Sequence, residues 1–143
     1  MSLEQNKTIV RRWYKALNMK DLDLLDELAA QDYFDRTRKL RGLENLKRLA
    51  TMVFKAFPDF HETVEDIIAE GDKVWTRCTV KGTHTGEFHG LVPTGNKFTM
   101  TAVDIWRIVD GKVVEKVGVL DQLDFYKQLG DIEYKGFPDE DVS

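Results

Sequence analysis

The chain has few of the features that cross-link a protein or anchor it in a membrane. Cysteine occurs once among 143 residues, as Cys78, so no internal disulfide can form and a reducing compartment fits the count. No apolar run approaches the ~20 residues of a membrane span, and the N-terminus lacks the apolar core of a signal peptide. These features predict a cytoplasmic protein.

An excess of basic charge is also lacking. Lysine and arginine together number 21 against 25 acidic residues, which gives a net charge of -4. Nucleic acids and anionic membranes reward basic patches, so neither is expected as the main partner. The basic groups at Arg11-Arg12 and Arg36–Arg41 are interpreted as a solvated helix face and a charged loop.

Apolar side chains are present in ordinary supply. They make up 42% of the 143 residues, which suits one domain with a hydrophobic core. No internal repeat, low-complexity block or linker divides the chain. We predict a single domain over residues 1–130 and a loosely ordered acidic tail over residues 131–143.

Helical spacing dominates the first third of the chain. Apolar residues within 9–17 recur at helical intervals, and Ser2 with Gln5 can form a capping box at the start of this helix. Asp21 is expected to cap a second helix, and Gly42 precedes a third. Three helices therefore open the chain.

The pattern changes to strands after Pro58, which ends the third helix. Strands are predicted over residues 61–69, 74–81, 98–109 and 113–121, and residues 33–36 form a short strand or an extended entry to a pocket. Asp110-Gly111 is a strong hairpin turn, and Gly130 ends a short final helix. Helices packed on a strongly curved, mostly antiparallel sheet define an α+β fold shaped as a cone-like barrel with one apolar cavity.

Two acids, Asp104 and Asp121, lie among apolar neighbours on the last two strands. If the hairpin turn has two residues, Asp104 lies opposite Val117 and Asp121 lies opposite Met100. The aspartates then share a face, about 13 Å apart, and form opposing walls of a pocket. Asp121 can instead be a helix N-cap, and Asp104 a buried acid satisfied by the backbone or Arg107.

Other catalytic or metal-binding patterns are missing from the sequence. His61, His84 and His89 do not have the spacing of metal ligands. No glycine-rich phosphate loop and no Ser-His-Asp or Cys-His set is visible. We therefore expect neither a metal nor an organic cofactor.

Several segments together carry a family resemblance over most of the chain, roughly residues 6–130. They are Asn18–Asp23, Ala56–Asp59, the loop Gly82–Gly90, Pro93–Gly95, Asp104–Glu115, Asp121–Leu123 and Gln128–Gly130. With these segments the chain resembles the SnoaL-like polyketide cyclases, an ester-cyclase-like group within the nuclear transport factor two-like superfamily.

The resemblance implies a cone-shaped α+β barrel, commonly a homodimer, and ring closure by intramolecular aldol condensation without metal or organic cofactor. It implies that proton transfer belongs to the acid at the end of the last strand, which is Asp121 here. The chain departs from its relatives at three positions: Asp104 and Arg36 stand where relatives carry histidine, and Val117 stands where they carry tryptophan.

The residues and the resemblance together predict a cyclase or isomerase acting on a small hydrophobic carbonyl compound. Asp121 is the expected general base and Asp104 its partner, because an apolar pocket can raise the pKa of a carboxyl toward that of a useful base. The residues expected to contact the substrate are Arg36, Tyr14, Trp106, Phe54, Met100 and Val117. The alternative is a non-catalytic protein that binds a small hydrophobic ligand in the same cone. The expected partners are that small molecule and a second copy of the chain, bound through the sheet.

Overall fold

The computed structural model describes residues 2–133, and residues 134–143 of the predicted tail lie outside that range. Helix α1 (Leu3–Asn18) begins with the predicted capping box, because Gln5 N donates to Ser2 Oγ and Ser2 N donates to the Gln5 side chain. A 3-10 turn, η1 (Leu22–Leu24), and a single-turn helix, α2 (Leu25–Leu28), follow. The predicted cap at Asp21 is wrong, because its side chain bonds no backbone N–H of the short 3-10 turn that forms here.

The remaining elements follow the predicted order, except for the short strand Leu40–Arg41, which was not predicted. They are β1 (Ala29–Asp35), β2 (Leu40–Arg41), α3 (Leu43–Ala56), β3 (His61–Glu70), β4 (Lys73–Thr83), β5 (Lys97–Val109), β6 (Lys112–Leu120) and α4 (Gln122–Leu129). The strands form one six-stranded sheet in the order β2-β1-β6-β5-β4-β3, in which only the β1/β6 pair is parallel. Residues 33–36 therefore belong largely to a strand, β1.

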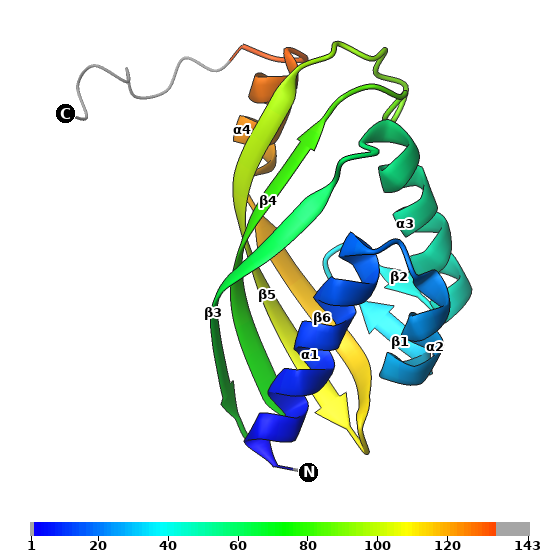
Figure 1. The fold of residues 1–143 in the computed structure, drawn as a ribbon, viewed down its shortest axis with the longest axis vertical. Coiled ribbons are helices and arrows are strands. Elements are labelled where there is room, and N and C mark those ends of the chain that lie inside the picture. The colour runs from blue at the N-terminus through cyan, green and yellow to red at the C-terminus, as the bar shows by residue number, and fades with distance from the viewer. Residues whose placement is uncertain (1, 134–143) are drawn as a thin grey trace, which may run out of the picture.

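The long strands β3, β4 and β5 bend and twist, and α1, α2 and α3 pack on one side of the sheet (Figure 1). Helix α4 lies at one end, against β5. The predicted α+β class is confirmed, with the sheet left open at its edge strands β2 and β3 rather than closed into a barrel. Within residues 2–133, no helix is both long and apolar enough to cross a membrane.

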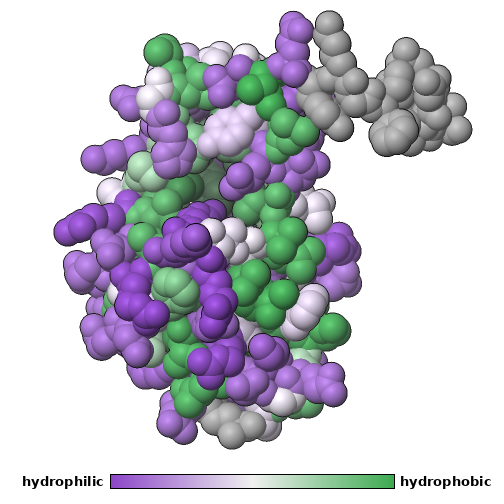
Figure 2. All heavy atoms as spheres, turned by 180° about the vertical axis from the view of Figure 1, so that it is seen from behind, coloured by the Kyte–Doolittle hydropathy of each residue, from purple (hydrophilic) through white to green (hydrophobic). Residues whose placement is uncertain are grey.

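Alternation along β4 supplies the core with side chains from one face of the sheet. Val74, Thr76, Cys78 and Val80 are buried, as their spacing predicts, whereas Trp75 on the other face is 46% exposed. Figure 2 shows the side of the molecule turned away from Figure 1, where apolar and charged side chains are intermixed. The homodimer through the sheet stays a prediction.

The hairpin between β5 and β6 has the predicted two-residue turn. Asp110 and Gly111 both have positive φ, 50° and 78°, and Val109 pairs with Lys112. The predicted register beyond this turn is wrong, however, because a β-bulge interrupts the ladder two pairs later.

The bulge adds one residue to β6. Ile108 pairs with Val113 but Arg107 pairs with Glu115, so Val114 has no partner of its own. Asp104 therefore lies opposite Gly118 rather than Val117.

A one-residue shift moves every side chain of a strand to the other face of the sheet. Lys116 and Gly118 consequently share the helix-covered face with Asp104, while Val117 pairs with Ile105 on the opposite face. The bulge therefore replaces a predicted apolar wall beside Asp104 with a lysine and a glycine.

Candidate active site

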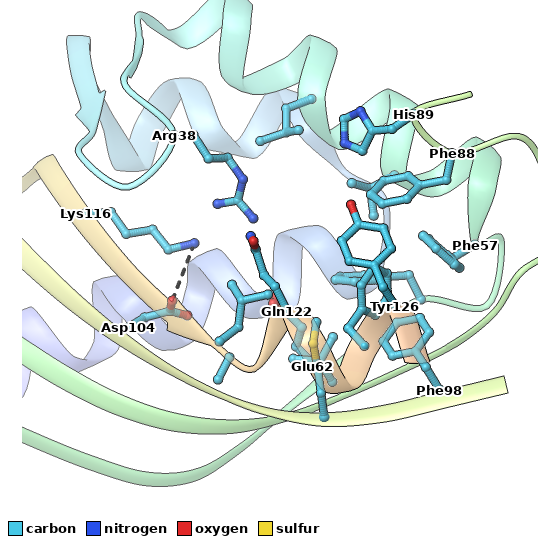
Figure 3. Close-up of a pocket in the computed structure, with 18 residues that line it drawn as sticks. Arg38, Phe57, Glu62, Phe88, His89, Phe98, Asp104, Lys116, Gln122 and Tyr126 are labelled. Atoms are coloured by element: carbon cyan, nitrogen blue, oxygen red, sulfur yellow. Dashed lines mark ion pairs between the residues drawn. The ribbon is translucent and has the colours of Figure 1, made fainter. Parts of the chain in front are cut away.

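A cavity of about 150 Å³ lies between the bent sheet, α3 and α4. Its walls are formed by Arg38, Leu49, Val53, Phe57, Phe60, Glu62, Val80, Phe88, His89, Phe98, Met100, Ala102, Asp104, Lys116, Leu120, Gln122, Phe125 and Tyr126. Figure 3 shows two unlike sides, with Arg38, Asp104 and Lys116 on one and the labelled phenylalanines on the other. We call the set Arg38, Glu62, Asp104 and Lys116 the charged end, and the set Phe57, Phe88, Phe98, Phe125 and Tyr126 the aromatic end.

Asp104 is fixed from beneath by a chain of hydrogen bonds. Tyr14 Oη donates to Asp104 Oδ2 at 2.5 Å, and Tyr14 Oη lies 2.7 Å from Thr76 Oγ1. Because the phenol proton goes to Asp104, the Thr76 hydroxyl donates to Tyr14, and it accepts from Trp106 Nε1 at 3.2 Å. All the donors point toward the carboxylate, so neighbouring bonds reinforce one another.

Lys116 supplies the positive charge beside this carboxylate. Its Nζ is 3.7 Å from Asp104 Oδ1, an ion pair drawn in Figure 3. The same Nζ is 5.0 Å from the centre of the Trp106 ring. Burial acts to lower the pKa of Lys116, but the negative charges of Asp104 and Glu62 outweigh it and raise that pKa above its usual range. Lys116 is therefore an ammonium ion at neutral pH, a cation rather than an amine nucleophile.

Gly118 explains how the lysine and the aspartate fit side by side. A Cβ at Gly118 would lie 3.1 Å from Asp104 Oδ1, closer than ordinary packing allows. The backbone of Gly118 also exchanges two hydrogen bonds of 2.8 Å with Thr37 Oγ1. The turn that carries Arg38 is thereby tied to β6.

Arg38 is positioned by a buried acid. Asp35, which is 2% exposed, accepts from Arg38 N and from Arg38 Nη1, both at 3.1 Å. A charge-assisted pair of this kind holds the arginine more firmly than a neutral contact does. The guanidinium therefore stays at the cavity wall.

Glu62 is the fourth charged residue of the wall. Burial raises its pKa to about 7, with the charge of Lys116 opposing and that of Asp104 adding to the shift. A carboxyl with such a pKa exchanges protons at neutral pH.

The aromatic end is a cluster of edge-to-face rings. Phe57 lies 5.1 Å from both Phe88 and Phe98, and Phe98 lies 4.8 Å from Phe125, measured between ring centres. His84, which is fully buried, packs on Phe57 and bonds through Nδ1 to Thr94, which anchors the loop before β5. This end therefore offers an aromatic surface against which an apolar group can pack.

Some residues predicted for the site lie at the cavity or directly beneath it. Asp104 and Met100 are in its wall. Tyr14 reaches it through the hydrogen bond to Asp104, and Trp106 is buried under the ammonium of Lys116. The roles predicted for these residues stay predictions.

Three other predicted contacts lie away from the cavity wall. Arg36, whose side chain is 60% exposed, forms an ion pair with Glu115 at 2.9 Å. Phe54 packs on Phe60 with ring centres 6.3 Å apart, and Val117 lies on the opposite face of the sheet because of the bulge.

Asp121 is exposed and caps helix α4. Its Oδ1 accepts from Asp124 N at 3.0 Å, which is the alternative foreseen from the sequence. The cavity wall instead includes the next residue, Gln122. The general-base role of Asp121 stays a prediction, and the two aspartates do not form opposing walls of this cavity.

Sequence reasoning missed Lys116, Glu62 and Arg38. The predicted register, with Asp104 opposite Val117, leaves Lys116 on the other face of the sheet, and only the bulge turns it inward. No role for Glu62 was predicted from the sequence. Among residues 2–133, no group of three histidine, cysteine, aspartate or glutamate side chains is arranged to hold a metal ion.

The fold and the cavity define an α+β cone protein with charged side chains at one end of its cavity. The sequence model of the family described as SnoaL-like polyketide cyclase matches residues 7–129. Aklanonic acid methyl ester cyclase DauD from Streptomyces sp. (strain C5) is 30% identical over 130 residues, covering 86% of this chain and 80% of DauD. The chain belongs to the SnoaL-like polyketide cyclase family.

Two solved structures extend this comparison. TsrD from Streptomyces laurentii has a TM-score of 0.86 at 25% identity, covering 92% of this chain and 99% of TsrD. AclR from Streptomyces galilaeus, described as a candidate hydroxylase, has a TM-score of 0.84 at 31% identity, covering 99% of this chain and 93% of AclR. Relatives of similar identity thus carry different descriptions, so the reaction has to be inferred from the site.

Proposed function

We propose that this protein closes a ring in a small carbonyl compound by an aldol-type reaction, using side chains alone for acid-base catalysis. The observation that supports it most is the ammonium of Lys116, held beside the hydrogen-bonded carboxylate of Asp104 at the opposite end of the cavity from the aromatic end. No metal or organic cofactor takes part in the proposed reaction.

The proposed reaction needs two catalytic groups from the protein, a base and a cation. A base removes a proton next to a carbonyl group, and a cation stabilises the negative oxygen that develops. A carboxyl of the charged end would serve as the base, and Lys116 would stabilise the oxyanion. Because the side chains of Lys116 and Asp104 are only 17% and 5% exposed, this stabilisation is worth more than it would be in solution.

The size of the cavity limits the part of the substrate that reacts. At about 150 Å³ it is smaller than the roughly 300–1,000 Å³ of usual ligand pockets. We therefore propose that a portion about one ring in size enters, with its apolar side on the aromatic end and its carbonyl at the charged end. Aklanonic acid methyl ester, on which DauD acts by name, is the first natural compound to test.

The test uses two substrates and two lysine variants. Wild type is assayed with aklanonic acid methyl ester and with heptane-2,6-dione, a linear diketone that closes to a six-membered ring. Lys116→Met removes the proposed oxyanion partner, and Lys127→Met removes an exposed lysine of α4 as the matched control. Turnover of either substrate that falls with Lys116→Met but survives Lys127→Met supports the proposal.

Binding without turnover by wild type would contradict catalysis and support the ligand-binding alternative. Turnover that survives Lys116→Met unchanged would contradict the role given to this lysine.

A further inference from the structure

Glu62 lies in a wall that two hollows share. It lines the cavity described above, and it also lines a surface groove between α1 and β3. The groove is formed by Arg11, Tyr14, Lys15, Asn18, Met19, His61, Glu62, Thr63 and Val64. We propose that Glu62 is the proton-transferring carboxyl of this site, taking a proton from the substrate in the cavity and exchanging it with solvent through the groove. This inference rests on the proposed function.

The carboxyl of Glu62 is available for such a transfer. Its Oε2 is buried and has no hydrogen-bond partner among residues 2–133. A buried oxygen without a partner costs free energy, which a substrate proton or a substrate hydroxyl would recover. Asp104 differs, because its Oδ2 accepts from Tyr14 and its Oδ1 faces Lys116.

The backbone of Glu62 is held in place. Asn18, at the end of α1, donates through Nδ2 to Glu62 O at 2.8 Å and accepts from Glu62 N at 2.9 Å. This paired contact fixes the start of β3 against α1, so the side chain stays between the cavity and the groove.

Charged and titratable groups surround Glu62 on both sides. On the cavity side they are Lys116, Asp104 and Arg38, and on the groove side they are Tyr14, Arg11, Lys15 and His61. Burial, the largest influence, raises the pKa of Glu62 to about 7. A base with a pKa near the working pH is the most effective kind.

The proton balance of the proposed step closes on Glu62. Its carboxylate takes a proton from the carbon next to one carbonyl, and the C–H electron pair forms the enolate, whose negative oxygen lies by Lys116. The enolate carbon then bonds to the second carbonyl carbon, whose oxygen receives the proton from Glu62. One proton is taken and one returned, so Glu62 ends as a carboxylate and no oxidant or reductant is needed.

The first test separates proton removal from ring closure. Cyclohexanone, a ketone one ring in size, is incubated with the protein in D2O, and NMR follows replacement of the hydrogens next to its carbonyl by deuterium. We expect wild type to catalyse this exchange and Glu62→Gln to lower its rate by about 10²–10⁴-fold. Glu65→Gln, an exposed change on the same strand, is the matched control and is expected to exchange like wild type.

The pH dependence of the exchange rate distinguishes a catalytic role of Glu62 from a purely structural one. Exchange by wild type is expected to rise with pH through about 7, the pKa to which burial raises Glu62. The exchange rate of Glu62→Asp should still rise with pH, whereas that of Glu62→Gln should not.

Absence of exchange in wild type, or exchange that Glu62→Gln leaves unchanged, would overturn the inference. Exchange that depends on Glu62 without closure of the diketone would keep the proton-transfer role and refute the proposed cyclisation instead.

Discussion

The two ends of the cavity are built by different means. The aromatic end is a set of apolar rings centred on Phe57, which are buried because they are hydrophobic. The charged end depends on long-range register, because Lys116 reaches Asp104 only through a bulge in β6. We therefore expect the first end to stabilise the fold, and we propose that the second end carries out the chemistry, at the free-energy cost of burying charged groups.

The largest expected effect on stability lies at the aromatic end. Phe57 is 1% exposed and contacts four other rings, so Phe57→Ala should lower the free energy of unfolding by about 3–5 kcal/mol. Denaturant unfolding measures it. Val92→Ala, at a position 73% exposed, is the control and should change stability by less than about 0.5 kcal/mol. A loss under about 1 kcal/mol for Phe57→Ala would show that this end is not the packed part of the core.

Substitutions at the charged end should mainly lower the rate of catalysis. Lys116→Met removes the proposed oxyanion partner and should lower kcat by about 10²–10³-fold, or about 2.7–4 kcal/mol, by analogy with loss of one oxyanion donor. The variant also leaves Asp104 buried without its cation, which is destabilising in itself.

The double variant Lys116→Met with Asp104→Asn separates these two effects, because it removes both charges. It should recover stability without recovering activity. Recovery of activity would contradict the role of Lys116.

The next largest effect that we expect is a pH-dependent change in stability caused by Glu62. Burial raises the pKa of Glu62 from its ordinary value of 4.5 to about 7, so between these pH values folding takes up a proton, and at higher pH the buried ionised carboxylate is destabilising. The penalty is absent below about pH 4.5 and complete above about pH 7. Glu62→Gln should therefore be more stable than wild type above pH 7 by up to about 3 kcal/mol, and the difference should vanish near pH 4.

Thermal unfolding of both proteins across this range measures the difference. A constant difference at every pH would show that Glu62 titrates normally.

The smallest effect on stability and turnover is expected at Asp121, which lies outside both ends of the cavity. Asn is as good an N-cap as Asp, so Asp121→Asn should change stability by a few tenths of a kcal/mol, whereas Asp121→Ala should cost about 1 kcal/mol. Both should retain turnover within a few-fold. Loss of turnover in Asp121→Asn with stability unchanged would instead support the general-base role predicted from the sequence.

Local signals allowed most of the fold to be predicted. The capping box at Ser2, the positive-φ turn at Asp110-Gly111 and the left-handed Gly130 each depend on a few neighbouring residues, and the structure has all three. The strand alternation of β4 needs only its period of two. These features are local, so sequence alone was enough.

The site was less predictable because it depends on pairing between distant strands. The hairpin turn was correctly predicted, yet the unpaired Val114 shifted β6 by one residue and reversed which side chains face inward. Nothing in the sequence around Val114 distinguishes it from a regular strand residue. Asp104 was identified from its apolar setting, while Lys116, its partner in space, was hidden by the same register error.

One measurement tests most directly whether the charged end stabilises an oxyanion. 4-Nitrophenol, a one-ring phenol, is titrated with protein at about pH 6, where the raised pKa of Glu62 keeps that carboxyl protonated, and its absorbance reports ionisation. Our account predicts that the protein binds the phenolate in preference to the neutral phenol, and that Lys116→Met loses this preference while Lys127→Met keeps it. Binding of the neutral phenol alone, or an equal preference in Lys116→Met, would contradict the account.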